Sequence, residues 1–317
     1  MGTKVTPTIE GGLLVAITVI LCLAAVYVPI LGIVVEFFCA VPIAVLTARQ
    51  GAGKGFMALT VAGILLVMFL GPPAALRLVL SFGLCGVTMG WCVRKNFSAV
   101  KIFLTVLIVA SAAQMLSIAL LLVLMDVNFI EMQITLLRES FAESFNMYEA
   151  MGVDKAQIAE SKKQMESGLE ALSLLMPTLI MLSAVMNAAA VWFTSKWIFP
   201  KLQIKLPQFP PFNEWRFPQI FLYVAAFGAI GMYWGFTRGW TQIYEIALNL
   251  TILAMLVGLI QGLALLSFLF DRYKVSKFLR RLFYVLIVLN MFLAQLVAVT
   301  GLIDMLFDYR KKFSDGR

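Results

Sequence analysis

Seven charged or amide side chains lie inside or at the ends of long apolar stretches of this sequence, where polar groups are costly and need a reason. An arginine suits a carboxylate or a phosphate, because its guanidinium forms two parallel hydrogen bonds with either group. Together with carboxylates and amides it could anchor a polar or zwitterionic solute. The candidate ligand-binding residues are therefore Glu36, Arg77, Gln114, Asp126, Asn187, Glu245 and Asn249.

A second interpretation of Glu36 and Arg77 needs no ligand. The two side chains can form a structural ion pair that neutralises itself at the membrane boundary, since an unpaired charge there is unfavourable. The sequence leaves both interpretations open.

The residue types present exclude several classes of catalytic and metal site. Histidine is absent, so the chain has no Ser-His-Asp triad and no H-E-x-x-H zinc site. The four cysteines form no C-x-x-C pair and lie in apolar runs, which is typical of small buried side chains. Residues 51–55 are not a phosphate-binding loop, because Ala48 and Gly55 replace the required glycine and hydroxyl residue. We expect no catalytic residue, no metal, no cofactor and no enzymatic activity.

The overall composition is that of a protein embedded in a bilayer. Hydrophobic residues make up 62% of the 317 residues and charged residues 13%, against about 45–50% and about 25% in soluble domains. The pattern predicts an all-α fold, a polytopic bundle of about eight or nine transmembrane helices. The apolar stretches are 12–31, 34–48, 55–71, 74–92, 101–125, 172–195, 218–237, 242–270 and 282–304.

The basic residues predict the orientation of these spans, because Lys and Arg gather in cytoplasmic loops. With the N-terminus in the cytoplasm, most basic residues fall on the inner side, and the short outer loops contain only Arg238. The net charge of +8 then reflects membrane orientation, and we expect no nucleic-acid partner. An odd number of spans leaves the basic tail at 310–317 outside, so either one segment is re-entrant or the tail is a weak violation.

Residues 126–171 interrupt the apolar pattern with a strongly acidic segment. Apolar residues recur in it at helical spacing, which predicts an amphipathic helix. Gly152 and Val153 then break the helix, and Asp154 could cap a second one. The orientation above places this helical hairpin outside the cell. It is either a lid over an outward-facing cavity or a solvated connector that rests on the bundle.

Residues 199–218 are rich in proline and aromatic side chains and predict a cytoplasmic linker at the membrane interface. This linker divides the chain into a six-span bundle over 1–198, which includes the outer hairpin, and a three-span region with its tail over 219–317.

Part of this linker, together with a later patch, carries a family resemblance. The stretch Pro210–Pro218, with the sequence PPFNEWRFP, resembles the PPF-x-EWR-x-P signature of the YybS family of bacterial membrane proteins. Leu259–Leu263 resembles a second patch of that family. The resemblance implies a polytopic membrane protein of bacteria and does not itself imply an activity.

Residues 10–198 show a broader resemblance, carried by the order of Val41–Ala44, the loop Gly51–Gly55 and Gly71–Pro73. They are similar to the substrate-binding S components of energy-coupling-factor transporters and to the cell-shape membrane protein MreD. In S components the resemblance implies six spans, a solute site near the outer face, and a coupling subunit docked on small residues of the first span. Those residues would be Gly12 and Ala16. The extra spans and the long outer hairpin depart from that pattern.

Two functions follow from these observations. The first is a solute-recognition subunit of the bacterial cytoplasmic membrane, which binds a small molecule outside and relies on a coupling subunit and its ATPase. The second is a non-transporting scaffold, similar to MreD, that organises envelope or signalling proteins. Both require the lipid bilayer, and they differ in their partners.

Overall fold

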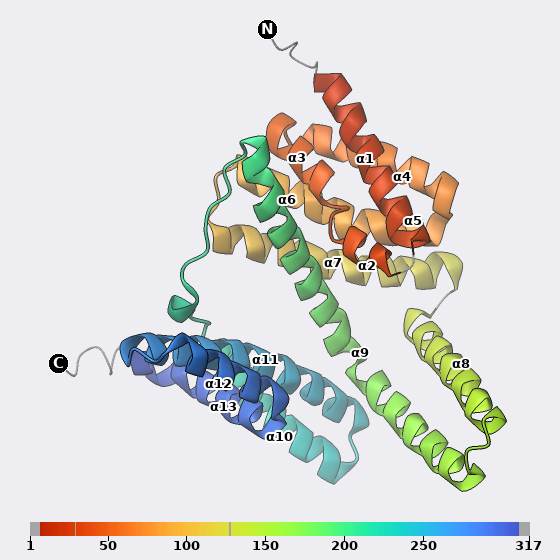
Figure 1. The fold of residues 1–317 in the computed structure, drawn as a ribbon, viewed down its shortest axis with the longest axis vertical. Coiled ribbons are helices and arrows are strands. Elements are labelled where there is room, and N and C mark those ends of the chain that lie inside the picture. Colours follow the sequence, from red (N-terminus) through yellow and green to blue (C-terminus); the bar gives the residue numbers. More distant parts are fainter. Residues whose placement is uncertain (1–6, 29, 127, 311–317) are drawn as a thin grey trace. The chain divides into compact units, whose positions relative to one another are not determined.

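The computed structural model describes residues 7–28, 30–126 and 128–310, and within those ranges the chain is helical and has no strand (Figure 1). The elements in order are α1 (Pro7–Tyr27), α2 (Leu31–Glu36), α3 (Val41–Gln50), α4 (Ala52–Leu70), α5 (Pro72–Leu78), η1 (Val79–Gly83), α6 (Leu84–Arg94), α7 (Ala99–Met125), α8 (Phe129–Ala150), α9 (Lys155–Ile198), η2 (Phe199–Leu202), η3 (Phe212–Glu214), α10 (Ile220–Arg238), α11 (Thr241–Arg272), α12 (Lys277–Leu289) and α13 (Met291–Phe307).

The helices form two compact units. The first unit contains the chain up to Leu169 together with Leu179–Phe209, and the second contains Glu170–Thr178 together with the chain from Pro210 onward. The long helix α9 contributes residues to both units.

Seven helices of the described ranges are long and apolar enough to cross a membrane, and the number becomes eight if the bent pair α12–α13 counts as one span. These helices include α1, α4, the continuous stretch Pro72–Arg94, α7 and the long helix α9. In the second unit they are α10 and α11. The polytopic all-helical fold that the composition predicts is therefore confirmed.

Residues 34–48 do not form the second span that their hydropathy predicts. They belong mostly to α2 and α3, which have 6 and 10 residues, whereas a span needs about 20. Every residue of Val41–Thr47 is buried in α3, so these side chains face other helices rather than lipid. The prediction was wrong because a helix buried in protein and a helix buried in lipid are equally apolar.

Helix α3 lies in the core of the first unit, and α6 crosses it at close range. A Cβ atom added to Gly86 would overlap the carbonyl oxygen of Ala40, and one added to Gly90 would overlap that of Ala44. Small residues allow this approach, which is how membrane helices associate when hydrophobic burial provides little drive. The crossing fixes the position of η1, which directly precedes α6 and carries the polar residue Ser81.

The acidic hairpin consists of α8 and the first part of α9. Gly152 has a φ of 80° in the turn, and the Asp154 side chain caps α9 by accepting a hydrogen bond from the Ala156 N–H. The Arg138 guanidinium donates two hydrogen bonds of 3.1 Å to the Glu166 carboxylate across the hairpin. These bonds raise the pKa of Arg138 above its usual value, because they favour the charged guanidinium.

No helix boundary separates this hairpin from the following span. Helix α9 runs for 44 residues from Lys155 to Ile198, whereas the sequence suggested a second hairpin helix ending near residue 171 and a separate span over 172–195. The change from polar to apolar side chains occurs inside one helix, since composition alone does not end a helix.

Residues 282–304 also differ from the single straight span that the sequence predicts. They lie in α12 and α13, whose axes differ in direction by 104°. The break is at Asn290, which has extended backbone angles, and its side chain caps α13 by accepting a hydrogen bond from the Leu293 N–H at 3.1 Å. The apolar stretch is interrupted here because the Asn290 side chain gives a backbone N–H a hydrogen-bond partner outside the regular helix.

In the second unit, α11 packs against both α10 and α13. A Cβ atom at Gly301 of α13 would overlap the Gly258 carbonyl oxygen and the Gly262 nitrogen of α11. The two backbones therefore touch where glycine is present on both helices.

We expect Gly301→Ala to destabilise the protein by about 1–3 kcal/mol, because the added methyl group overlaps backbone atoms that cannot rotate away. The measurement is the thermal unfolding midpoint of the purified protein in detergent. The matched control is Gly168→Ala in α9, where a Cβ would meet no atom within 4 Å and helix propensity favours alanine. A Gly301→Ala protein as stable as this control would contradict the close packing.

Candidate functional site

The polar centre of the first unit is a single π-helical turn, η1, between α5 and α6. The Leu84 N–H donates to the carbonyl oxygen of Val79, five residues earlier, so the turn contains one more residue than an α-helical turn. Such turns are rare and occur frequently at functional sites. Ser81 lies in the middle of this turn and is buried.

Two of the predicted ligand-binding residues converge on Ser81 from other helices. The Ser81 hydroxyl donates to Gln114 Oε1 of α7 at 3.4 Å, and Asn187 Nδ2 of α9 donates to the Ser81 carbonyl oxygen at 2.8 Å. Asn187 Oδ1 is buried and has no hydrogen-bond partner among the described residues. An acceptor in this state is unfavourable, so in the cluster formed by Ser81, Gln114 and Asn187 the Asn187 oxygen can still accept a hydrogen bond.

The predicted charges Glu36 and Arg77 also come together, and they meet each other. Arg77 Nη1 donates to Glu36 Oε1 at 2.8 Å, with 49% and 23% of the two side chains exposed. This is the geometry of the structural ion pair that the sequence allowed. Arg77 stands four residues before Ser81 on the same helical stretch, so the ion pair and the polar cluster lie about one turn apart.

Asn249 has a different environment, in the second unit, where it joins the backbone of α9. It accepts from the Thr178 N–H at 3.0 Å and donates to the Leu174 carbonyl oxygen at 2.8 Å. In a regular helix these two backbone groups would pair with each other. The neighbouring Pro177 lies inside the helix and disturbs this ladder. The amide of Asn249 therefore binds two backbone groups of α9 that lie one helical turn apart beside Pro177.

Asn249 also uses its remaining hydrogen-bonding capacity inside the protein. Its second amide hydrogen goes to the Glu245 carbonyl oxygen at 2.8 Å, and its Oδ1 accepts from the Thr178 hydroxyl at 2.6 Å. The side chain is 7% exposed. The protein itself occupies the donors and the acceptor that a solute would need.

The two remaining predicted acids are not part of the Ser81 cluster. Asp126 ends α7 in the left-handed conformation, with a φ of 53°. Gln114 lies twelve residues earlier on that helix, about 18 Å away at 1.5 Å per residue. Glu245 is half-buried in α11 of the second unit. A ligand-binding role for Asp126 and Glu245 stays a prediction. The Glu245 carbonyl oxygen accepts a hydrogen bond from Asn249.

The predicted docking residues lie on an open face of α1. Gly12 and Ala16 are exposed, and a Cβ atom at Gly12 would meet nothing within 4 Å. The neighbouring Leu13 and Ile20 are 60% and 63% exposed. This face is free to contact lipid or another membrane helix.

The sequence analysis missed three residues of these polar clusters: Ser81, Pro177 and Thr178. A serine or threonine in a span can bond its own helix and attracts no attention. Pro177 was a usable signal, because a proline inside an apolar helix frees a carbonyl group that needs a partner from elsewhere. The π-helical turn depends on packing between distant helices, and no residue pattern marks it.

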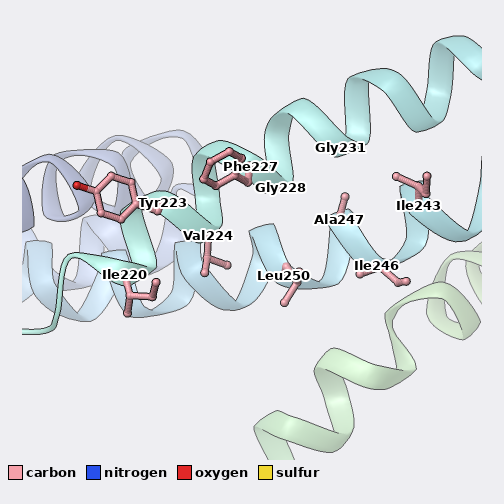
Figure 2. Close-up of a pocket in the computed structure, with 10 residues that line it drawn as sticks. All are labelled: Ile220, Tyr223, Val224, Phe227, Gly228, Gly231, Ile243, Ile246, Ala247 and Leu250. Atoms are coloured by element: carbon pink, nitrogen blue, oxygen red, sulfur yellow. The ribbon is translucent and has the colours of Figure 1, made fainter.

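A groove of about 400 Å³ lies between α10 and α11 in the second unit (Figure 2). Gly228 and Gly231 let α11 approach α10 closely, since a Cβ at either would overlap α11 side chains. Phe227 and Leu250 are among the apolar side chains that line the groove. Tyr223 is the one lining residue with a polar side chain. The groove contains none of the predicted ligand-binding residues, and its lining suits a hydrocarbon chain or an apolar helix.

The two stretches that carry the family resemblance, Pro210–Pro218 and Leu259–Leu263, meet in the second unit. The Phe217 N–H donates to Gln261 Oε1 at 3.1 Å, and Gln261 Nε2 donates to Asp304 Oδ2 at 2.6 Å. Gln261 and Asp304 are 2% and 4% exposed. A buried amide thus fastens the end of the linker to α11 and α13.

Comparison with known proteins identifies a family of predicted membrane proteins and one similar protein. Residues 16–305 match the family model described as "Predicted membrane protein (DUF2232)". The chain is similar to "Uncharacterized protein YybS" of Bacillus subtilis (strain 168), with 24% identity over 310 residues, which are 96% of this chain and 97% of that protein. No solved structure matches the chain.

The contacts of Asn249 give a prediction that pairs it with Pro177. We expect Asn249→Ala to lower the free energy of unfolding by about 1–3 kcal/mol, because it removes buried hydrogen bonds between α11 and α9. The loss should be smaller in a Pro177→Ala background, where no proline disturbs the hydrogen bonds of α9. Unfolding of all four proteins in detergent gives the coupling energy, and an equal loss in both backgrounds would contradict this role.

Proposed function

Because this chain belongs to the DUF2232 family of predicted membrane proteins, we propose for it a function inside the bilayer, the recognition of a small polar solute by the first unit. It is a multi-pass membrane protein, and we place it in the cytoplasmic membrane of a bacterium with its N-terminus inside. In this proposal it binds the solute without altering it, and a partner ATPase drives any transport.

The convergence of Gln114 and Asn187 on Ser81 is the observation that carries this proposal. Three segments distant in sequence direct polar groups to one point of the first unit, and one of the segments is a π-helical turn. Most buried polar groups in proteins have a hydrogen-bond partner. Asn187 Oδ1 lacks a partner among the described residues, so the cluster fits a solute that supplies a donor.

The same contacts indicate the chemistry of the solute. A hydroxyl or an amine would satisfy Asn187 Oδ1 by donating a hydrogen bond. Arg77 uses its Nη1 for Glu36, and its guanidinium has further N–H groups in a fork that matches a carboxylate or a phosphate. A small acid that also carries a hydroxyl or an amine fits both positions.

A scaffold without a solute is the second candidate function. It is favoured by the ion pair between Glu36 and Arg77, since each charge already has a partner, and by the open face of α1 at Gly12 and Ala16. Small residues on such a face allow another membrane helix to approach closely.

The solute proposal predicts ligand-dependent thermal stabilisation of the purified protein. We expect at least one compound in a panel of vitamins and cofactor precursors to raise the unfolding midpoint. Asn187→Ala should abolish this shift. Arg77→Gln should weaken binding of an acidic ligand about tenfold or more, because it removes a charge-assisted hydrogen bond.

The matched control is Ser111→Ala on α7, the helix that also carries Gln114. Its hydroxyl bonds the Leu107 carbonyl oxygen within its own helix, so the ligand-induced shift should be unchanged. The absence of a shift with every compound, together with the absence of a co-purifying ATPase, would overturn the proposal.

The scaffold candidate predicts a partner that stays bound in detergent through α1. Gly12→Leu combined with Ala16→Leu should abolish co-purification of that partner without lowering the unfolding midpoint, because the face is open. Ala112→Leu combined with Ala119→Leu, at exposed positions of α7, is the matched control and should retain it. Loss of the partner in both double variants would argue against a specific surface on α1.

A further inference from the structure

The loop before α12 and its first turn display basic side chains without partners. Lys274, Lys277 and Arg281 are exposed, and no hydrogen bond or ion pair of their side chains occurs within the part of the chain that the structure describes. The acids Asp271, Asp304 and Asp308 in this region each form an ion pair with another arginine. Positive charge is therefore left over at this place.

Helix α12 combines these charges with an apolar face. At 100° per residue, Lys277 and Arg281 share one side of the helix with Arg280, together with Val288 of its last turn. The leucines and phenylalanines lie toward the other side. That apolar side is uncovered, with Phe278 and Leu289 each 78% exposed. A strongly amphipathic helix with basic residues on its polar face is typical of helices that lie in the membrane interface.

The helix is held in a fixed position by contacts of its own unit. Arg280 forms an ion pair with Asp271 and donates to the Phe270 carbonyl oxygen at 2.8 Å. The Phe270 ring contacts Phe283 and Tyr284, with centroids 5.7 and 5.9 Å apart. These contacts hold α12, and with it the exposed basic residues, against the end of α11.

The bend after α12 keeps this helix out of the adjoining span. Helix α13 packs on α11 through Gly301, and α12 differs from it in direction by 104°. A straight continuation of α13 would carry α12 along the same axis, and the bend instead turns it across that axis. The observed geometry agrees with a helix at the membrane surface or one that enters it only partly.

Contacts at the two ends of the pair agree with this placement. The first turn of α12 is bound to Asp271 through Arg280, and Asp271 accepts from Asn213 Nδ2 at 2.9 Å. Arg310, three residues beyond the end of α13, donates to the Asn213 carbonyl oxygen at 2.7 Å. The pair thus begins and ends at one polar cluster, as expected of a re-entrant segment with both ends on the same membrane side.

We propose that the basic patch formed by Lys274 in the loop before α12 and by Lys277 and Arg281 of α12 binds the headgroups of anionic phospholipids. Charge complementarity selects the headgroup, because the surplus here is positive and a lipid phosphate with an acidic headgroup is negative. The uncovered apolar face selects a lipid over a soluble anion, since acyl chains beside the headgroup can cover it.

The test compares phosphatidylglycerol with phosphatidylcholine on the full-length protein. Native mass spectrometry of the detergent-solubilised chain, titrated with each lipid, gives an apparent Kd for each. We expect the protein to prefer phosphatidylglycerol. Lys274→Gln combined with Lys277→Gln should weaken phosphatidylglycerol binding by about fivefold for each charge removed, and leave phosphatidylcholine binding unchanged.

Two further variants make the result decisive. Lys155→Gln combined with Lys163→Gln removes two exposed charges from α9, and we expect it to bind both lipids like the original protein. Lys274→Arg combined with Lys277→Arg keeps the charge and should keep the preference, which separates charge from folding. Equal binding of the two lipids by the original protein, or the same loss in the α9 variant, would overturn the proposal.

Discussion

A backbone N–H or carbonyl group that faces hydrocarbon needs a hydrogen-bond partner, and helices supply it only while they remain regular. At three places in this chain an amide side chain binds a backbone group beside a helix irregularity or at the end of the linker. Asn249 enters the ladder of α9 beside Pro177, and Asn187 binds a carbonyl oxygen of the π-helical turn. Gln261 accepts a hydrogen bond from the Phe217 N–H at the end of the linker, shortly before α10 begins.

The three side-chain amides differ in how many of their hydrogen-bonding groups the protein itself uses. Asn249 spends both amide hydrogens and its oxygen on the protein, and Gln261 is engaged at its oxygen and its nitrogen. Asn187 donates from Nδ2 and has a buried oxygen without a partner among the described residues, as does Asn213 in the linker. The solute proposal rests on Asn187 because its amide meets Gln114 and Ser81 at one point.

Sequence reasoning succeeded where a local property decides the structure. The long apolar stretches became helices, and Asp154 became a cap, because length and side-chain chemistry act on neighbouring residues. It failed for α3, since its burial depends on α6 and other helices far along the chain. It also missed Ser81, whose partners Gln114 and Asn187 are 33 and 106 residues away, and no local pattern reports such a meeting.

Three acids of the second unit are each paired with an arginine, while several exposed bases before and on α12 have no such partner among the described residues. Asp271, Asp304 and Asp308 are each matched by an arginine, and Gln261 adds a hydrogen bond to the buried Asp304. Of these pairs only Arg310 with Asp304 is buried, and that pair would be unfavourable if either partner were missing. Lys274 and Lys277 lie outside these pairs, which do not need them for their neutrality. Their charge is available to a partner outside the protein, and the uncovered apolar side of α12 indicates that this partner is the membrane.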